Sequence, residues 1–471
     1  MAIEHSSDEP DRSDGGPRPD PAHPGVPLGA RGGPAAGGSA AARPLAELGR
    51  RAHPSALPAS GAWRVGDDPG DRRFVPVSDG RPFALEGGGI LRGAEVAYET
   101  FGSLNDDASN AILVCHALTG DSHLAGRSSA AHPASGWWDG TVGPGKAIDT
   151  DRWFVVCVNV LGGCQGSTGP ASLHPDDDRP YGSRFPVVSV RDMVRSQGAV
   201  ADALGIDRWH CVMGGSMGGM QALEWAIMYP ERVGSVVVIA SCEAASAQQI
   251  GWWSVGRRVI RMDPAWRDGD YYDAPPGHGP HEGLATARMV SQITFRSDDV
   301  FTDRFGRELV ESLDGFQLWQ RFQVERYLEY HGDKLVRRFD ANTYLVLTKA
   351  MDLHDIGRGR GSAQAALRRV RSPLLAVGVS SDILYPAYQS REIVDHARAA
   401  GVAARYRELD SPHGHDAFLI EHEEVGELLV PFLDDPHATV TKEHEDHPHG
   451  CLLYTSPSPR DLSTSRMPSS A

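Results

Sequence analysis

The sequence predicts an α/β protein with a mostly parallel central sheet, helices on both faces and an inserted helical cap. Apolar runs of strand length alternate with segments of helical periodicity, an order typical of a parallel sheet covered on both sides. Between residues 245 and 365 this alternation stops, and the chain becomes helical and charged with scattered Trp residues. An insertion of that length between two sheet strands predicts a cap or lid.

Five runs rich in Val and Ile are predicted to be the buried parallel strands. They span residues 111–116, 153–161, 209–213, 234–240 and 373–379. Helical patterns follow several of them, over residues 190–204, 218–229, 386–400 and 416–433. Two earlier runs, 73–77 and 95–100, have no helix between them, so we expect antiparallel edge strands there.

Composition sets the expected domain boundaries. Residues 1–70, rich in Gly, Pro and Ala, cannot bury enough apolar area to offset their chain entropy and are predicted to be a disordered tail. Residues 71–244 and 366–435 form the α/β domain that would carry the chemistry, and 245–365 form the cap. Residues 436–471 are predicted to be a second disordered tail. Its last 21 residues resemble translated sequencing-adapter sequence, and our hypothesis is that they are not native.

Charge and cysteine usage limit the possible partners. The chain has 46 basic and 62 acidic residues, a net charge of −16, which argues against nucleic acid or an anionic membrane as the main partner. No long apolar run or secretory signal is present, so we expect a cytoplasmic protein. The six Cys lack CxxC or Cys/His spacing, which favours reduced thiols over disulfides and predicts no metal site.

Residues 214–219 read GGSMGG and lie between a predicted strand and a predicted helix. This is the setting of a nucleophile elbow, in which a tight turn exposes a Ser hydroxyl above the sheet. Side chains two residues before and after the nucleophile would clash, which explains Gly214 and Gly218. The pattern predicts Ser216 as a nucleophile and the amide of Met217, at a helix N-terminus, as a donor to an oxyanion. A plain Gly-rich turn is the alternative.

A nucleophilic Ser requires a base and an acid that orients the base, and in this arrangement they follow in the order Ser, Asp, His. Asp382 comes directly after the strand at 373–379, at its carboxyl end. Two histidines, His413 and His415, precede the last predicted helix, and their positions alone do not decide between them. The loop after the strand at 111–116 is where a second oxyanion amide would lie, and Leu118 N–H is the candidate.

Longer stretches around these residues resemble a known family, the homoserine O-acyltransferases of the α/β-hydrolase superfamily, and among them the homoserine O-acetyltransferases. The resemblance covers most of residues 75–435 and is far more specific than a GxSxG motif alone. The motifs that carry it include FGSLN (101–105), HALTG (116–120), GGSMGGMQALEW (214–225), RFDANTYL (338–345) and GHDAFL (414–419).

The resemblance implies an α/β-hydrolase fold and assigns the base to the His of GHD, which is His415. It also implies that Arg288 binds the carboxylate of homoserine and Asp416 its amine, a suitable pair for a zwitterion. Phe295 is a departure, because the family usually has Tyr there. L-homoserine and acetyl-CoA are the implied substrates, acetyl-CoA acting as co-substrate with no bound cofactor, and a homodimer formed through the cap is expected.

The implied reaction transfers an acetyl group to the γ-hydroxyl of homoserine through an acyl-serine, giving O-acetyl-L-homoserine for methionine biosynthesis. Two enzymatic alternatives share the scaffold: homoserine O-succinyltransferase, whose acyl pocket cannot be identified from spacing, and a serine esterase. An esterase has no use for Arg288 and Asp416. A binding protein without activity is disfavoured because every position of the triad is filled.

Overall fold

A computed structural model describes residues 57–311 and 317–441 of the chain. Its central sheet has eight strands in the order β1-β4-β8-β5-β9-β10-β11-β12. The β1–β4 and β4–β8 pairs are antiparallel, and the pairs from β8 to β12 are parallel. The predicted α/β-hydrolase class and the antiparallel edge are therefore confirmed.

The strands match the predicted runs closely. The sheet strands are β1 (Arg73–Pro76), β4 (Glu95–Phe101), β5 (Ala111–Cys115), β8 (Phe154–Val158), β9 (Cys211–Gly215), β10 (Val236–Ile239), β11 (Leu374–Val379) and β12 (Ala404–Leu409). Two small ribbons lie outside this sheet, formed by β2 (Phe83–Ala84) with β3 (Ile90–Leu91) and by β6 (Val142–Gly143) with β7 (Ile148–Asp149).

Alternate side chains of the inner strands pack into two separate hydrophobic cores. In β10, Val236 and Val238 pack into the larger core, whereas Val237 and Ile239 pack into the smaller one. Successive side chains of a strand point to opposite faces, so a strand buried on both sides must be apolar at every position. This is why the strand sequences are continuous apolar runs.

Helices from different parts of the chain cover the two faces. Apolar residues of α1 (Val190–Ala203), α2 (Met217–Met228) and α9 (Ala387–Ala399) belong to the larger core. Those of α10 (His422–Asp434) and α11 (Pro436–Thr441) belong to the smaller one. Helices thus cover both faces of the sheet, so a functional site has to lie at an edge of the sheet.

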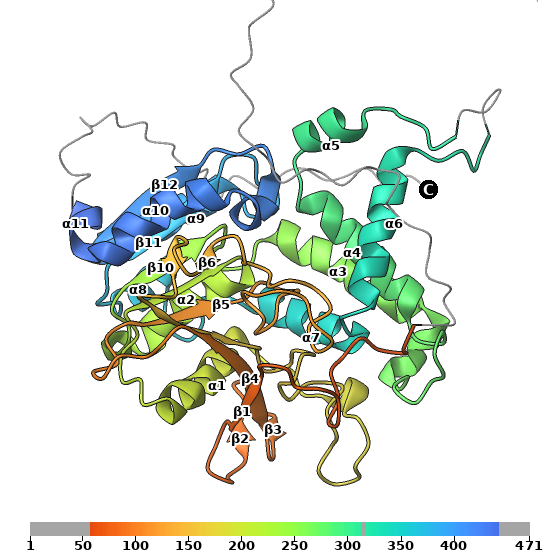
Figure 1. Cartoon of the computed structure of the whole chain (residues 1–471), viewed down its shortest axis with the longest axis horizontal. Coiled ribbons are helices and arrows are strands. Elements are labelled where there is room, and N and C mark those ends of the chain that lie inside the picture. The colour runs from red at the N-terminus through yellow and green to blue at the C-terminus, as the bar shows by residue number, and fades with distance from the viewer. Residues whose placement is uncertain (1–56, 312–316, 442–471) are drawn as a thin grey trace, which may run out of the picture. The chain divides into compact units, whose positions relative to one another are not determined.

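The predicted cap is helical and is inserted between β10 and β11. In Figure 1, α3 to α6 lie together to one side of the sheet, in green to cyan. Its helices are α3 (Ala247–Met262), α4 (His281–Thr294), α5 (Asp298–Phe305), α6 (Gln323–Val336), α7 (Ala341–Asp352) and α8 (Ala363–Leu367). None of the helices in the described ranges has the length and apolar character needed to cross a membrane.

Three expectations were wrong in detail. The predicted end of the N-terminal tail, residue 70, is too late. Ser60 donates a hydrogen bond to Asp340 at 2.7 Å, and Trp63 N–H donates to Cys164 O at 2.9 Å. Residues from 57 onward therefore pack on the domain. The predicted start of the C-terminal tail, residue 436, is too early, because α11 begins there and buries Val440. The helical pattern at 416–433 is a 3₁₀ segment (Gly414–Leu419) followed by α10. Residues 1–56 and 442–471 lie outside the described residues.

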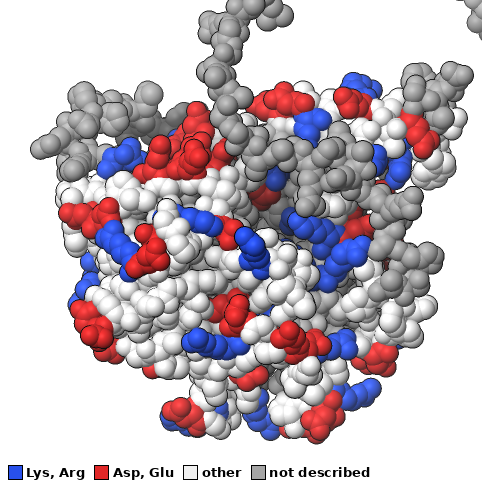
Figure 2. All heavy atoms as spheres, viewed as in Figure 1, with Lys and Arg blue, Asp and Glu red and all other residues white. Residues whose placement is uncertain are grey.

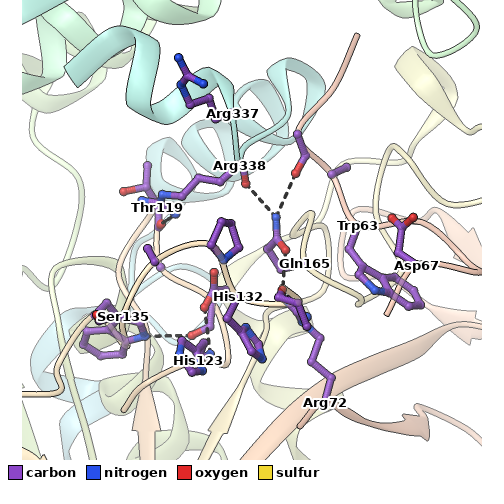
Figure 3. A pocket seen from close by; sticks show the side chains of 18 of the residues that line it. Trp63, Asp67, Arg72, Thr119, His123, His132, Ser135, Gln165, Arg337 and Arg338 are labelled. Atoms are coloured by element: carbon purple, nitrogen blue, oxygen red, sulfur yellow. Dashed lines mark hydrogen bonds between the residues drawn. The ribbon is translucent and has the colours of Figure 1, made fainter. Parts of the chain in front are cut away.

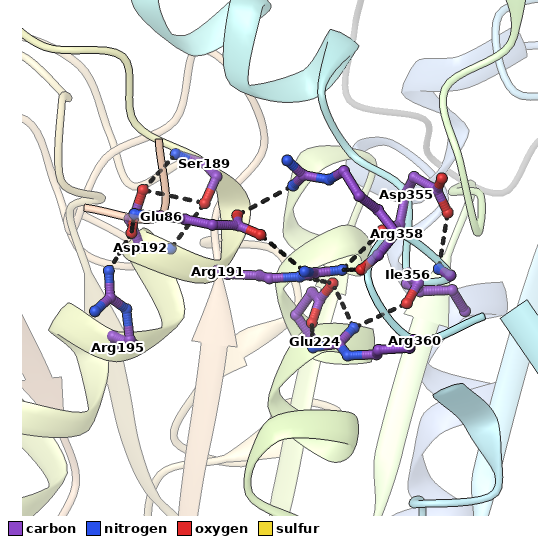
Figure 4. Close-up of polar contacts among 11 residues, drawn as sticks. Glu86, Ser189, Arg191, Asp192, Arg195, Glu224, Asp355, Ile356, Arg358 and Arg360 are labelled. Atoms are coloured by element: carbon purple, nitrogen blue, oxygen red, sulfur yellow. Dashed lines mark hydrogen bonds and ion pairs between the residues drawn. The ribbon is translucent and has the colours of Figure 1, made fainter. Parts of the chain in front are cut away.

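A buried ion-pair network ties α2 to neighbouring segments (Figure 4). Glu224 of α2 is 1% exposed and accepts hydrogen bonds from Arg191 at 2.9 Å and from Arg360 at 3.0 and 2.7 Å. Arg191 also reaches Glu86 at 2.8 Å. The network therefore joins α1, α2 and the segment before α8 around the helix that follows the elbow.

We expect Glu224→Gln to lower the free energy of unfolding by about 3 kcal/mol, because removing one partner of a buried pair leaves uncompensated charge. Glu231→Gln is the matched control, since its pair with Arg371 is exposed (70% and 67%) and such pairs contribute about 0–1 kcal/mol. Chemical denaturation of both variants measures the difference. Equal losses in the two variants would contradict a structural role for the network.

Candidate active site

Ser216 lies in a sharp turn between β9 and α2. Its φ of 57° and ψ of −123° are strained for a residue with a Cβ, as expected of a nucleophile elbow. A Cβ built on Gly214 would lie 2.5 Å from Gly218 C, and one built on Gly218 would lie 2.1 Å from Cys115 O. Both positions therefore require glycine, for the reason the sequence suggested. Ser216 itself is 4% exposed.

Asp382 and His415 form a buried pair at the same edge of the sheet. His415 Nδ1 lies 2.7 Å from Asp382 Oδ2, and the two residues are 4% and 5% exposed. The other oxygen of Asp382 accepts the amides of Leu384 at 2.8 Å and Tyr385 at 2.9 Å. These bonds fix the carboxylate, which in turn keeps a proton on Nδ1 and leaves Nε2 free to act as a base.

Shared neighbours place His415 beside the elbow. The Phe418 ring lies edge-on to His415, with centroids 5.9 Å apart, and a Cβ on Gly215 would lie 2.4 Å from that same ring. Tyr385 stacks on His415, with ring centroids 5.0 Å apart. Aromatic contacts thus hold the His415 ring, and Phe418 touches both that ring and Gly215, the residue before Ser216.

His413 occupies a different environment. Its side chain is 34% exposed and lies 3.7 Å from Glu421, away from Asp382. The geometry therefore agrees with the assignment of the base to His415, which position in the sequence alone left open.

The charges around His415 favour its protonated form. Burial lowers the pKa of His415, but the carboxylate of Asp382 and, more weakly, that of Asp416 outweigh burial, so the pKa lies above its ordinary value. A base with a raised pKa is well suited to hold the proton taken from a Ser hydroxyl during attack.

The sequence predicts that the amides of Met217 and Leu118 receive an oxyanion. Met217 is the first residue of α2, so its N–H has no acceptor within the helix. Leu118 lies in the loop after β5 and is 4% exposed. His116 fixes this loop, because its Nδ1–H donates to Ala117 O at 2.8 Å while its Nε2 accepts Val160 N–H at 3.1 Å.

The predicted homoserine contacts lie close to one another on the cap side. Arg288 of α4 lies over the Phe295 ring at 5.0 Å, and Phe295 lies 5.8 Å from His415. Burial lowers the pKa of Arg288, and the charge of Asp416 opposes that effect. Asp416 is also held by Arg296 at 3.3 Å, a residue that the sequence reasoning missed. The site therefore presents two guanidinium groups and one carboxylate near His415.

A buried Glu–His–His group is the one candidate metal cluster found among the described residues. It comprises Glu99, His123 and His132, whose nearest ligand atoms lie within 4.8 Å of one another. The two imidazoles are stacked, with centroids 3.8 Å apart and planes 11° apart. A metal ion lies in the plane of each imidazole that binds it, so stacked rings cannot both bind one ion unless one turns. Glu99 instead accepts hydrogen bonds from Ser122 at 2.7 Å and His123 at 3.1 Å.

Comparison with known proteins agrees with this geometry. The sequence profile described as the alpha/beta hydrolase fold matches residues 110–421. Together with the parallel sheet, the elbow and the buried Asp–His pair, this match shows a member of the alpha/beta hydrolase family.

A protein of Thermobifida fusca (strain YX) named homoserine O-acetyltransferase is 53% identical over 377 residues, which are 80% of this chain and 97% of the relative. One of the same name from Clavibacter michiganensis subsp. michiganensis (strain NCPPB 382) is 51% identical over 379 residues, 80% of this chain and 96% of the relative. The chain belongs to the homoserine O-acetyltransferase family, a family of acyltransferase enzymes.

Solved structures of similar fold include both transferases and esterases. Homoserine O-acetyltransferase from Bacillus anthracis is 29% identical with a TM-score of 0.71, covering 77% of this chain and 97% of that one. Esterase E22 is 30% identical with a TM-score of 0.70, covering 77% and 99%. Fold alone therefore does not separate acyl transfer to an alcohol from acyl transfer to water.

Proposed function

We propose that this enzyme transfers an acetyl group from acetyl-CoA to the γ-hydroxyl of L-homoserine through an acetyl-Ser216 intermediate. The observation that carries the proposal is the buried 2.7 Å Asp382–His415 pair at the edge where the strained elbow presents Ser216. Membership of the homoserine O-acetyltransferase family supports the choice of substrates.

In the first half-reaction, His415 Nε2 takes the proton of Ser216 Oγ as that oxygen attacks the thioester carbon. The N–H groups of Leu118 and Met217 stabilise the resulting oxyanion. When the C–S bond breaks, His415 returns the proton to the thiolate, and coenzyme A leaves as a thiol. The acetyl group remains on Ser216.

In the second half-reaction, His415 accepts the proton of the homoserine γ-hydroxyl as its oxygen attacks the acetyl carbon. The bond to Ser216 Oγ then breaks, and Oγ recovers the proton from His415. The chemical risk is hydrolysis of the acyl-serine. The low exposure of Ser216, 4%, and the cap above the sheet edge limit the access of water.

Recognition of homoserine is assigned to the charges beside the base. The guanidinium of Arg288 would bind the substrate carboxylate in a bidentate manner, and Asp416, held in place by Arg296, would bind the amine. Phe295 supplies an apolar wall between Arg288 and His415, without the hydroxyl that the family usually has there.

We expect Arg288→Lys to raise the KM for homoserine by about 10- to 100-fold, because an ammonium cannot reproduce the bidentate geometry. Steady-state kinetics with varied homoserine measure the change, and Arg258→Lys, at an exposed position of α3, is the matched control. An unchanged KM for homoserine would remove Arg288 from the substrate site.

The choice of donor and acceptor is tested directly. Purified enzyme is supplied with acetyl-CoA or succinyl-CoA, with and without homoserine, and both free coenzyme A and O-acyl-homoserine are quantified. We expect O-acetyl-homoserine from acetyl-CoA and little product from succinyl-CoA. Hydrolysis at full rate without homoserine would favour an esterase, the second candidate, which the likeness to esterase E22 supports.

The cellular setting is part of the same proposal. O-acetyl-homoserine would serve methionine biosynthesis, no cofactor would be bound, and the enzyme would act in the cytoplasm. The cap exposes apolar side chains that a homodimer would cover: Ile250, Val255, Met262, Ile293, Leu318 and Trp319. Light scattering of the purified enzyme measures the oligomeric state.

A further inference from the structure

Ser241, which follows β10, contacts the backbone of the elbow. Its Oγ donates a hydrogen bond to Ser216 O at 2.8 Å. Ser216 O belongs to the same peptide group as the N–H of Met217. A trans peptide is planar, and its C=O and N–H point in opposite directions. A donor on Ser216 O therefore also sets the direction of the Met217 N–H. Ser241 is 0% exposed, and no step of the reaction described above uses it.

The carboxyl end of β10 holds both backbone polar groups of Ser216. Ser216 N–H donates to Ile239 O at 2.9 Å, and Ser241, two residues further on, donates to Ser216 O. Ala240, between them, has a φ of 45°, a strained value for a residue with a Cβ. Such strain persists where the surrounding structure holds it, and it is concentrated at functional sites. The turn at Ala240 thus brings Ser241 to the elbow.

Gly219 leaves the space that the Ser241 side chain occupies. A Cβ built on Gly219 would lie 2.6 Å from Ser241 Cβ and 2.9 Å from Ser241 Oγ. The steric argument for the elbow accounts for Gly214 and Gly218 but not for this third glycine. The contact with Ser241 explains why the motif GGSMGG ends in two glycines.

His116 makes the equivalent contact on the other side of the site. Its Nδ1–H donates at 2.8 Å to Ala117 O, which belongs to the same peptide group as the N–H of Leu118. Val160 N–H donates to Nε2 at 3.1 Å, so the ring proton lies on Nδ1. Burial lowers the pKa of His116, which keeps the ring neutral. His116 therefore sets the direction of the Leu118 N–H as Ser241 sets that of Met217.

Gln221 joins the two segments that carry these peptides. Its side-chain Nε2 donates to His116 O at 3.2 Å and to Met217 O at 3.1 Å. Its Oε1 accepts a hydrogen bond from Gln197 at 2.6 Å, and both amides are 0% exposed. The loop after β5 and the first turn of α2 are thus held at a fixed separation.

The two N–H groups themselves are left for a ligand atom. Within residues 57–311 and 317–441, neither the N–H of Leu118 nor that of Met217 donates to an acceptor. The two residues are 4% and 0% exposed. Buried backbone N–H groups without a partner are rare in folded proteins. Their carbonyl partners, in contrast, are firmly bound.

Neutral, buried groups make most of these contacts. Figure 2 shows acidic and basic side chains interspersed over one face of the molecule, where dissolved salt screens them. One cation takes part at the site: Arg338 donates to Thr119 O at 2.7 Å, on the loop that carries Leu118 (Figure 3). Because Ser241 and His116 are neutral, the effects of their variants should not depend on ionic strength.

We propose that Ser241 and His116 are positioning residues of the oxyanion hole. Each donates to the carbonyl oxygen of the peptide whose N–H holds the oxyanion, and so fixes the direction of that N–H before the substrate binds. Donors that are fixed in advance stabilise a developing charge without reorganising during the reaction. This proposal rests on the proposed function, which supplies the two amides.

Ser241→Ala is expected to lower kcat and kcat/KM for acetyl transfer together, by about 10-fold, as for the loss of one hydrogen bond. An equal fall in both is typical of a contact that matters only in the transition state. The loss is moderate because Ser216 O also accepts the N–H groups of Gly219 at 2.9 Å and Met220 at 3.2 Å.

Ser235→Ala is the matched control. Ser235 immediately precedes β10, is also 0% exposed, and donates to a backbone oxygen, His210 O, at 2.8 Å. The two variants should lose similar free energies of unfolding, but Ser235→Ala should keep its kcat. Equal kcat values in the two variants would overturn the role of Ser241.

Two amide replacements of His116 separate positioning from packing. The side-chain NH₂ of Asn lies near the place of Nδ1, so His116→Asn can still donate to Ala117 O. The longer Gln lies near the place of Nε2, so His116→Gln can accept Val160 N–H but leaves Ala117 O without this donor. We expect kcat to fall by less than about threefold in His116→Asn and by at least about 10-fold in His116→Gln. Equal losses, or the reverse order, would overturn the role of His116.

Binding of an oxyanion can be measured without turnover. The probes are the ketone analogue of acetyl-CoA, in which CH₂ replaces sulfur, and its trifluoromethyl counterpart. Ser216 Oγ adds to the activated carbonyl carbon, the C=O electron pair moves to the oxygen, and the Oγ proton passes to His415. We expect Ser241→Ala to weaken binding of the trifluoromethyl ketone about 10-fold and that of the methyl ketone by less than about twofold. Equal weakening of both, or of neither, would overturn the proposal.

Ser216→Ala separates this inference from the proposed function. The unaltered enzyme should bind the trifluoromethyl ketone more tightly than the methyl ketone, and Ser216→Ala should lose that preference. If Ser216→Ala keeps the preference, the acyl-serine mechanism is wrong. If Ser216→Ala loses it and Ser241→Ala keeps it in full, the positioning role alone is wrong.

Discussion

Replacing Ser216 by Ala is expected to lower kcat for acetyl transfer by at least about 10³-fold and to abolish acetyl exchange between coenzyme A thiols. The hydroxyl is the only group at this position that can carry the acetyl group. The amides of Leu118 and Met217 remain in the variant, so weak residual turnover is compatible with the mechanism, whereas exchange is not. Isotope exchange between acetyl-CoA and labelled coenzyme A measures the loss.

The fold should tolerate this change. Ser216 has a φ of 57°, which Ala also adopts only with strain, so the free energy of unfolding should change little. Ser103→Ala, at an exposed position near the amino end of β5, is the control for handling and expression. Ser103→Ala should keep its exchange activity, and exchange in Ser216→Ala at the rate of this control would contradict the covalent intermediate.

Replacing Asp382 by Asn is expected to lower kcat by about 10³- to 10⁴-fold while leaving the fold intact. An Asn side chain can still accept the amides of Leu384 and Tyr385 through its oxygen. Its NH₂ group would then face His415 Nδ1 and favour the tautomer with the proton on Nε2. That tautomer cannot accept a proton from Ser216, so the base is lost without a loss of packing. Steady-state kinetics and thermal unfolding, measured together, test both parts.

The same variant should change the pH dependence. The unaltered enzyme needs His415 unprotonated, and because Asp382 raises the pKa of His415, kcat/KM should fall as the pH drops through that raised value. Without the carboxylate, burial dominates and lowers the pKa, so the acidic limb of the residual activity should move to lower pH. A limb that stays in place, or moves to higher pH, would show that another group titrates.

Much of the site follows from local sequence. A GxSxG turn between a strand and a helix requires Gly214 and Gly218 for steric reasons that involve only the turn and the adjacent strand. Asp382 could be placed because the carboxyl ends of parallel strands meet at one edge of the sheet. The choice between His413 and His415 could not be made this way, since both lie in one loop. The family resemblance favoured His415, and the folded chain shows that it is His415 that contacts Asp382.

Contacts between distant segments were beyond sequence reasoning. Arg296 lies 120 positions before Asp416, and no sequence pattern in either segment predicts their ion pair. The packing of Ser60 on Asp340 was missed because a short polar stretch after a Gly- and Pro-rich region looks like part of a tail. Strand β12 was missed as well, since its charged, half-exposed sequence, ARYREL, lacks the apolar run of the inner strands.

The most direct test of the account is the intact mass of the enzyme after mixing with acetyl-CoA alone, followed by addition of homoserine. We predict a mass increase of one acetyl group, located on Ser216 by peptide mapping, and its discharge by homoserine with formation of O-acetyl-homoserine. Discharge by water at the same rate, or homoserine acetylation by an enzyme that never acquires the acetyl group, would contradict the account.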